Sequence, residues 1–114
     1  MAQNPAPEVD AAEGHRLVTA GALLLDVRED DEWAAGHVPD AVHIALGQLG
    51  TDYESLPKDA RIVAICRSGG RSARAAAALN EAGYDVINLA GGMRAWAEAG
   101  FSIMSADGTA GRVI

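Results

Sequence analysis

The feature that most constrains the fold of this chain is an alternation of short apolar runs with segments of helical composition. Apolar runs of four to eight residues are typical of strands that are covered on both faces. When such strands alternate with helices, the helices serve as crossovers between parallel strands. The chain therefore predicts an α/β domain of three layers, in which a mostly parallel, roughly five-stranded central sheet is flanked by helices.

The boundaries of these elements follow from their local signals. Strands are expected at residues 7–9, 22–27, 41–46, 61–66 and 85–89. Helices are expected at residues 11–20, 29–36, 72–82 and 91–100. Asp10 followed by Glu13 is typical of a capping box at the start of the first helix. Residues 47–60 are mixed and turn-rich, with Pro57 as a boundary, and residues 101–114 read as irregular.

Size and composition indicate one domain. The chain has 114 residues, 49% of them hydrophobic, which suits a single core. We expect this domain to occupy residues 9–104, after a flexible N-terminal tail at 1–8. Residues 105–114 form a C-terminal tail that either packs back or hangs free. No apolar run reaches the roughly 20 residues of a membrane-spanning helix, and the N-terminus does not resemble a secretory signal. We therefore expect a cytoplasmic protein without a membrane partner.

Charge and cysteine content narrow the functional classes. The formal net charge of −7 disfavours nucleic acid as a partner, because binding phosphates requires an excess of Lys and Arg. The single cysteine, Cys66, allows no internal disulfide and leaves no second thiol to resolve one. Arg67, Arg71 and Arg74 nevertheless crowd beside it, so that an acidic protein carries a locally cationic site.

Cys66 ends the clearest apolar run, in the segment RIVAICRSGGRSAR (61–74). The carboxyl end of a central strand is where open α/β sheets bind ligands. Gly69 and Gly70 permit positive φ, so that backbone amides can form an anion-binding nest at a helix N-terminus. With the charges of Arg67 and Arg71, these groups favour a thiolate and lower the pKa of a nucleophilic Cys66. The plainer interpretation is a small buried core residue, but core packing explains neither the Gly-Gly pair nor the arginines.

At these residues the chain resembles the rhodanese-like single-domain sulfurtransferases. CRSGGRS (66–72) is similar to the active-site loop of that family, and LLDVREDDEWAAGHVPDAVHI (24–44) and INLAGGMRAW (87–96) resemble other family segments in the same order. The resemblance covers Val9 to Phe101. Asp40 departs from the pattern because the family usually has glycine after the proline, and we expect a local change of the turn there.

The resemblance implies a sulfurtransferase that needs no metal or organic cofactor. Cys66 would accept a sulfane sulfur from thiosulfate or a persulfide and pass it from its own persulfide to a thiophilic acceptor, a thiol in cells or cyanide in an assay. Arg71 would bind the oxyanion of the donor, with Arg67 at the rim. The loop residues that would supply backbone amides are Ser68, Gly69, Gly70 and Ser72. A protein persulfide is a further candidate donor, and we expect a monomer.

Two other functions stay open. Phosphatases that share the fold have five residues between cysteine and arginine, whereas four separate Cys66 from Arg71; a phosphatase or arsenate reductase is therefore a minor alternative. A single thiol further disfavours a reductase that resolves internally. Rhodanese-like domains also serve as docking or redox-sensing modules, and an exposed thiolate would suit sensing.

The remaining polar and aromatic residues have simpler interpretations. In the family, the positions of Asp26, Arg28 and Glu32 support the active-site loop through hydrogen bonds and ion pairs. The histidines match no metal-ligand spacing, so no metal site is expected; they are His15, His37 and His43. Two tryptophans, Trp33 and Trp96, are expected to pack on the core. The glycines at 91–92 are best explained by a tight turn from strand to helix.

Overall fold

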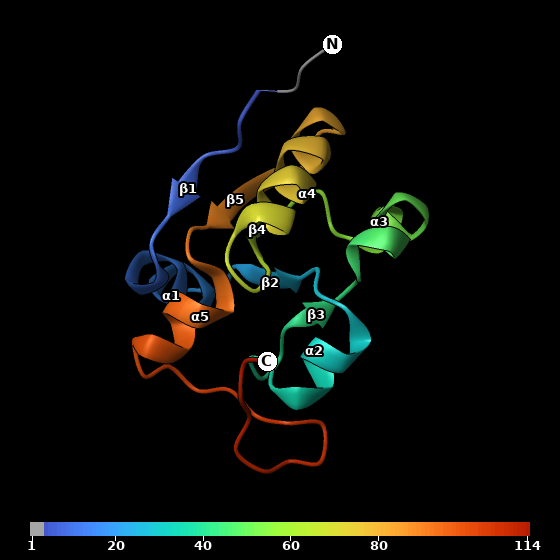
Figure 1. Ribbon diagram of the computed structural model, residues 1–114. Helices are drawn as coiled ribbons and strands as arrows, with labels where there is room; N and C mark the ends of the chain where they lie inside the picture. Colours follow the sequence, from blue (N-terminus) through green and yellow to red (C-terminus); the bar gives the residue numbers. More distant parts are fainter. Residues whose placement is uncertain (1–3) are drawn as a thin grey trace.

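The computed structural model describes residues 4–114, and these form a five-stranded parallel sheet with helices on both faces (Figure 1). The strand order is β1-β5-β4-β2-β3, and all pairs are parallel. The strands are β1 (Glu8–Val9), β2 (Leu23–Asp26), β3 (Val42–His43), β4 (Arg61–Ile65) and β5 (Asp85–Leu89). This confirms the predicted three-layer α/β fold, with β4 at the centre of the sheet.

Two sets of helices cover the two faces of the sheet. The helices are α1 (Ala11–Thr19), α2 (Asp30–Ala35), α3 (Leu46–Asp52), the 3-10 turn η1 (Tyr53–Ser55), α4 (Gly70–Glu81) and α5 (Gly92–Glu98). Helices α1 and α5 lie on one face, whereas α3 and α4 lie on the other (Figure 1). The short helix α2 lies beyond β3, near the carboxyl ends of the strands.

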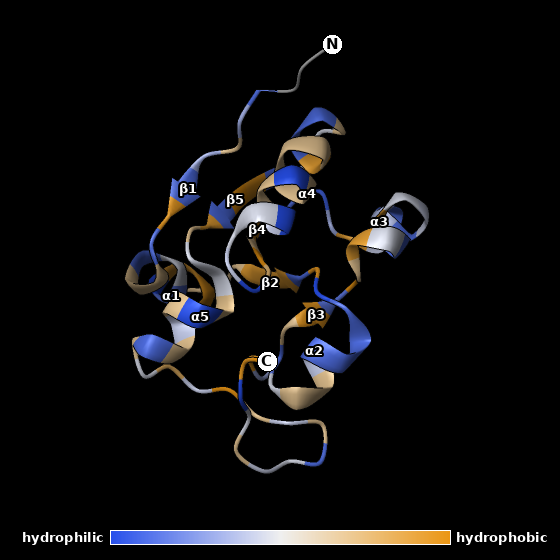
Figure 2. Cartoon of the chain, viewed as in Figure 1, coloured by the Kyte–Doolittle hydropathy of each residue, from blue (hydrophilic) through white to orange (hydrophobic). Residues whose placement is uncertain are grey.

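The core is divided by the sheet into two apolar clusters, as expected when both faces are covered. Successive residues of β2 and β4 point to opposite faces: Leu25 and Ile62 pack toward α3 and α4, and Leu24 and Val63 toward α1 and α5. Trp96 of α5 is 2% exposed and completes the second cluster. The central strands accordingly form the most hydrophobic part of the ribbon in Figure 2.

Three local predictions differ from the structure. Helix α3 contains Leu46, read as the end of a strand, and residues 47–52, read as part of a turn-rich stretch. Leu46 and Leu49 pack against the core although Gly47 and Gly50 weaken the helix. Helix α4 begins at Gly70 and not at Ser72, so the loop after Cys66 is tighter than expected. Strand β3 is only two residues long.

The chain ends also carry contacts. Glu8 falls both in the strand predicted at residues 7–9 and in the tail predicted at 1–8; in the structure it is the first residue of β1 and pairs with β5. The segment 101–114 folds back on α2: the His37 and Met104 backbones pair, and the Arg112 amide donates to the Ala35 carbonyl. Of the two alternatives for residues 105–114, the structure has the packed one, since the amides of Ala106 and Arg112 donate to α2 carbonyls. No helix within residues 4–114 is long and apolar enough to cross a bilayer.

Candidate active site

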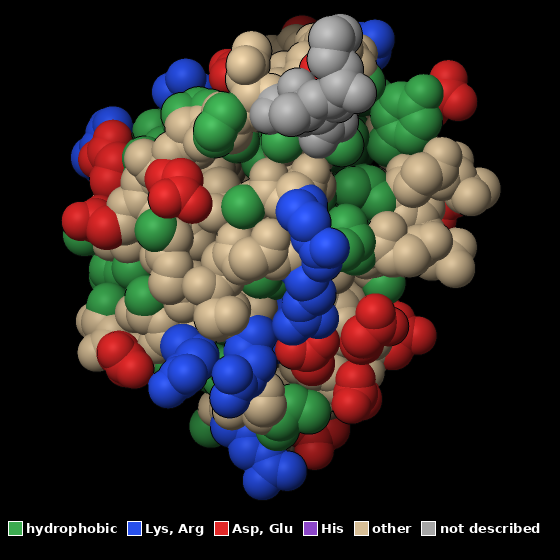
Figure 3. Space-filling model, turned by 45° about the horizontal axis from the view of Figure 1, so that its top comes forward, with side chains coloured by type: hydrophobic (Ala, Val, Ile, Leu, Met, Phe, Trp, Pro, Cys, Tyr) green, Lys and Arg blue, Asp and Glu red, His purple; other side chains and the backbone are tan. Residues whose placement is uncertain are grey.

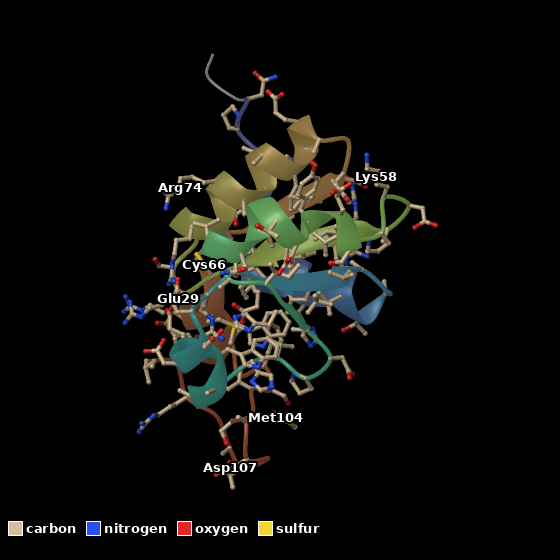
Figure 4. The ribbon with its side chains drawn as sticks, turned by 90° about the vertical axis from the view of Figure 1, so that its right-hand side faces the viewer. Glu29, Lys58, Cys66, Arg74, Met104 and Asp107 are labelled. Carbon is tan, nitrogen blue, oxygen red and sulfur yellow. The ribbon has the colours of Figure 1, made fainter. Side chains whose placement is uncertain are left out.

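Cys66 follows the last residue of β4 and lies at the carboxyl edge of the sheet, where the sequence placed it. The residue is 1% exposed. In Figure 4 its sulfur lies at the same end of the molecule as Arg74 and Glu29, whereas Lys58 lies at the opposite end of the sheet. The thiol is thus held at the base of a loop.

The loop after Cys66 is shaped by one glycine in the left-handed region. Gly69 has φ of 109° and is the N-cap of α4. A side chain there would be strained by the backbone conformation and would also approach the Gly91 amide within 3.3 Å. Gly70, which was expected to share this role, is already helical and has no positive φ. A single left-handed residue therefore turns the backbone amides toward the sulfur.

Several donors converge on the sulfur of Cys66. The Gly69 amide donates to Sγ at 3.1 Å, and the Ser72 hydroxyl lies 3.3 Å from it. Burial opposes ionisation of the thiol, but hydrogen bonds from Ser72, then from the Gly69 and Ser68 amides, outweigh it and lower the pKa of Cys66 below that of a free thiol. The loop thus favours a thiolate mainly through hydrogen bonds and less through the full charges that the sequence emphasised.

Behind the loop lies a buried polar network that the sequence analysis missed. Asn88 of β5 is fully buried, and its Oδ1 accepts from the Ser72 hydroxyl at 2.6 Å. Its Nδ2 donates to Glu8 Oε2 at 2.8 Å and to the Gly69 carbonyl at 3.1 Å. A buried polar residue in an apolar strand requires hydrogen-bond partners, and Asn88 in the segment DVINL was the available signal.

Helix α5 holds the loop from the other side. The Met93 amide donates to the Cys66 carbonyl at 2.7 Å, and the Arg94 amide donates to the Arg67 carbonyl at 3.1 Å. Gly92 makes this contact possible, since a Cβ on it would come within 2.4 Å of the Cys66 carbonyl oxygen. Gly92 therefore serves close packing against the loop, and the Met93 and Arg94 amides are already bonded to the loop.

A buried ion pair ties β2 to α2. Asp26 and Arg28 are 1% and 0% exposed, and Arg28 Nη2 donates to Asp26 Oδ2 at 2.8 Å. The guanidinium also donates to the backbone carbonyls of Glu32 at 3.2 Å and Gly36 at 2.7 Å. Each of the two charges is compensated, as a buried pair requires. The pair therefore positions α2, and neither side chain contacts Cys66.

The second ion pair lies beside the loop. Arg71 Nη1 and Nη2 donate to the two carboxylate oxygens of Glu32 at 2.7 and 2.8 Å. This bidentate contact lowers the pKa of Glu32 to about 2, despite partial burial, and raises that of Arg71. Glu32 Oε1 also accepts from the Glu29 amide at the start of α2. The two residues, 39 positions apart, thereby join α2 to α4.

Three further arginines, Arg67, Arg74 and Arg94, lie in the loop or on the two helices that flank it. Arg67 Nε donates to the Ile114 carbonyl oxygen at 2.8 Å, and Arg74 and Arg94 are exposed. Figure 3 shows basic side chains gathered on one face of this acidic protein, next to a group of acidic ones. An apolar hollow of about 460 Å³ lies between α3 and α4, with Arg74 at its border.

The remaining candidates have structural contacts. Trp33 stacks between the rings of His37 and His43, with centroids 3.9 and 4.7 Å apart. His37 Nδ1 bonds to the Trp33 carbonyl and His43 Nε2 to the Arg28 carbonyl. In the described part of the chain, no three His, Cys, Asp or Glu side chains are grouped to hold a metal ion.

Fold and site together define a class: a parallel α/β domain in which a cysteine at the end of the central strand is enclosed by an amide-lined loop. The family model for the rhodanese-like domain matches residues 10–99, which is most of the chain. The chain belongs to the rhodanese-like family, which confirms the resemblance seen in the sequence.

Individual relatives agree with this assignment. A protein of Allochromatium vinosum named sulfurtransferase is 41% identical over 91 residues, which cover 79% of this chain and 85% of that protein. YtwF of Bacillus subtilis is 49% identical over 73 residues, covering 64% of this chain and 71% of the other. A rhodanese-related protein of Thermoplasma volcanium has a similar structure, with a TM-score of 0.82 at 28% identity, covering 86% and 97% of the two chains.

Proposed function

We propose that the protein transfers a sulfane sulfur from thiosulfate or a persulfide donor to a thiophilic acceptor through a persulfide on Cys66. The observation that carries the proposal is the set of donors at Sγ, where the Gly69 amide and the Ser72 hydroxyl favour the thiolate. Sulfurtransferase relatives over most of the chain support the reaction class.

The reaction would proceed in two nucleophilic displacement steps. In the first, the Cys66 thiolate attacks the outer sulfur of thiosulfate; a new S–S bond forms, and sulfite leaves with the electron pair of the bond that breaks. In the second, cyanide or a thiol attacks the terminal sulfur of the persulfide, and Cys66 leaves as the thiolate. The same amides that face Sγ would stabilise the anionic terminal sulfur.

Arg71 is the proposed ligand for the oxyanion of the donor. Its contact with Glu32 uses two of the five N–H groups of the guanidinium, so the others can bind a sulfonate-like group. Arg67 is a second candidate at the rim. The loop amides of Ser68, Gly69, Gly70 and Ser72 complete the proposed binding set. Supporting roles go to Asp26, Arg28 and Glu32 through the contacts of α2.

We propose the physiological sulfur donor and acceptor from the chemistry of the site alone. We propose that a small thiol or a protein persulfide reacts at the loop that carries Arg67 and Arg71, and that the protein acts as a cytoplasmic monomer. A docking module without chemistry is less well supported, because the nucleophile and its donors are intact. A four-residue spacing between Cys66 and Arg71 argues against phosphate ester hydrolysis.

The direct test is thiocyanate formation from thiosulfate and cyanide by the purified protein, beside Cys66→Ser and with phosphate ester hydrolysis measured on the same samples. The proposal predicts thiocyanate formation that Cys66→Ser abolishes while its circular dichroism spectrum is unchanged. Thiocyanate formation retained by Cys66→Ser, or ester hydrolysis in place of sulfur transfer, would refute it.

A further inference from the structure

The Ser72 hydroxyl has one proton and three acceptors within reach. Its Oγ lies 2.6 Å from Asn88 Oδ1, 3.3 Å from Cys66 Sγ and 3.3 Å from the Gly69 carbonyl. A hydroxyl donates only one hydrogen bond at a time. The acceptor that holds the proton therefore decides whether Ser72 stabilises the sulfur.

The Gly69 carbonyl is the weakest competitor of the three. It already accepts from the Ala73 amide at 3.1 Å and from Asn88 Nδ2 at 3.1 Å, which occupies both of its lone pairs. The competition is therefore between Asn88 Oδ1 and Cys66 Sγ.

The amide of Asn88 can present only its oxygen to Ser72. Its Nδ2 faces two acceptors, the Glu8 carboxylate at 2.8 Å and the Gly69 carbonyl. In a flipped amide the oxygen would face both of these acceptors, and two hydrogen bonds would be replaced by repulsion. Glu8 and Gly69 thus determine the orientation of a side chain that is itself fully buried.

We propose that Asn88 is a positioning residue that holds the Ser72 hydroxyl while Cys66 is a thiol and yields it to Sγ when Cys66 is a thiolate. In the thiol state the Ser72 oxygen is free to accept from the S–H group. On ionisation the Cys66 proton goes to solvent, and the Ser72 proton stays on Ser72 and only changes its acceptor. Asn88 Oδ1 then faces a lone pair of Ser72.

The competition for the Ser72 proton predicts the direction in which Asn88 shifts the pKa of Cys66. Asn88 stabilises the thiol relative to the thiolate, so it opposes the effect of Ser72 and keeps the pKa of Cys66 from falling further. The charged groups around the thiol are Arg71, with Glu32 and Glu29 beside it, Arg67, and Glu8 behind Asn88. These groups act through their charge, whether or not residue 72 has a hydroxyl. Their effect on the pKa of Cys66 can therefore be distinguished from the proposed effect of Asn88, which requires the Ser72 hydroxyl.

The test is a double-mutant cycle on the ionisation of Cys66, the only thiol in the chain. The thiolate absorbance is followed against pH in the full chain for wild type, Asn88→Ala, Ser72→Ala and the double variant. Asn88→Ala should raise the acid dissociation constant of the thiol about threefold or more, as for one hydrogen bond gained. In the Ser72→Ala background, Asn88→Ala should change the acid dissociation constant of the thiol by much less.

Two further variants keep the test decisive. Asn80→Ala is a matched control, because Asn80 makes two hydrogen bonds to the Val86 backbone at the other end of β5 and should not move the titration. If Asn88→Ala does not fold, Glu8→Ala at an exposed position removes the closer of the two acceptors that orient the amide. Its effect should likewise be larger with Ser72 present than absent.

An effect of Asn88→Ala that is equal in both backgrounds, or a decrease of the dissociation constant, would overturn the proposal. So would equal effects of Glu8→Ala in both backgrounds. The inference rests on the proposed role of Cys66, but the titration requires no sulfur donor. If Asn88 does not control the Ser72 hydroxyl, the double-mutant cycle shows it. If the proposed function is wrong, thiocyanate formation is absent.

Discussion

At the scale of single residues, Asp40 occupies a backbone conformation that glycine adopts more easily. Its φ is 69°, and it is exposed in the turn before β3. The turn therefore holds a residue with a side chain in the left-handed region. Asp40→Gly should raise the melting temperature by up to a few degrees, because the relief of strain exceeds the added entropy of the unfolded chain.

The control is Asp40→Ala, which keeps a Cβ in the left-handed region and should not stabilise the protein. Thermal unfolding followed by circular dichroism compares the three proteins. A lower melting temperature for Asp40→Gly than for wild type would show that the aspartate side chain stabilises the turn.

Arg71 has the most specific predicted role among the charged residues. Arg71→Ala should raise the KM for thiosulfate about tenfold or more, because a charge-assisted contact to the donor is lost. The pKa of Cys66 should rise less than in Ser72→Ala, since hydrogen bonds dominate at the sulfur. Arg74→Ala, one turn further along α4, is the matched control and should leave KM nearly unchanged. Equal KM values for Arg71→Ala and wild type would remove Arg71 from donor binding.

At the scale of elements, the Glu32–Arg71 pair joins α2 to α4. The pKa of Glu32 is about 2 in the folded protein, below its ordinary value of 4.5. A lowered carboxyl pKa contributes stability that is complete above the unfolded value and is lost as pH falls from about 4.5 toward about 2. Glu32→Gln should therefore lower the free energy of unfolding at pH 7 by about 1 to 3 kcal/mol, allowing for the partial exposure of Arg71.

Urea unfolding at several pH values measures this difference. The deficit of Glu32→Gln should shrink by more than half between pH 7 and about pH 3. Glu13→Gln, which breaks the exposed pair with Arg16, is the control and should have little effect at either pH. A deficit of Glu32→Gln that does not change with pH would contradict the ion-pair interpretation.

The contact between α5 and the active-site loop depends on the absence of a side chain at Gly92. Gly92→Ala would place a Cβ 2.4 Å from the Cys66 carbonyl oxygen and 2.7 Å from backbone atoms of Arg67. The loop must move, so we expect a loss of about 2 kcal/mol or more in stability and a lower rate of sulfur transfer.

Gly100→Ala is the control that separates the effect of the Cβ clash at Gly92 from the effect of a positive φ. Gly100 also has positive φ, but an added Cβ meets nothing within 4 Å. Its substitution should lower stability with little effect on the rate of sulfur transfer in the folded protein. Equal rates for folded Gly92→Ala and wild type would show that the loop geometry tolerates the displacement.

At the scale of the whole molecule, the sequence was sufficient to predict the three layers of the fold and the position of the Cys66 thiol. The segments ALLLDV, RIVAIC and DVINL are apolar runs of strand length, so β2, β4 and β5 could be predicted from composition alone. Cys66 then had to lie at the carboxyl edge because β4 is parallel to its neighbours.

What the sequence could not provide are pairings between distant segments. The contacts of Glu32 with Arg71 and of Asn88 with Glu8 join residues 39 and 80 positions apart, and no local pattern encodes them. Helix α3 was missed because its stability comes from tertiary packing of Leu46 and Leu49 and not from helix propensity. Long-range packing also explains the ordered course of residues 101–114 over α2.

The most direct measurement is the intact mass of the protein after incubation with thiosulfate and removal of the reagent. A Cys66 persulfide predicts a gain of one sulfur atom that disappears on addition of cyanide and never forms in Cys66→Ser. An unchanged mass in a folded protein whose thiol still reacts with an alkylating reagent, or the same gain in Cys66→Ser, would contradict sulfur transfer through Cys66.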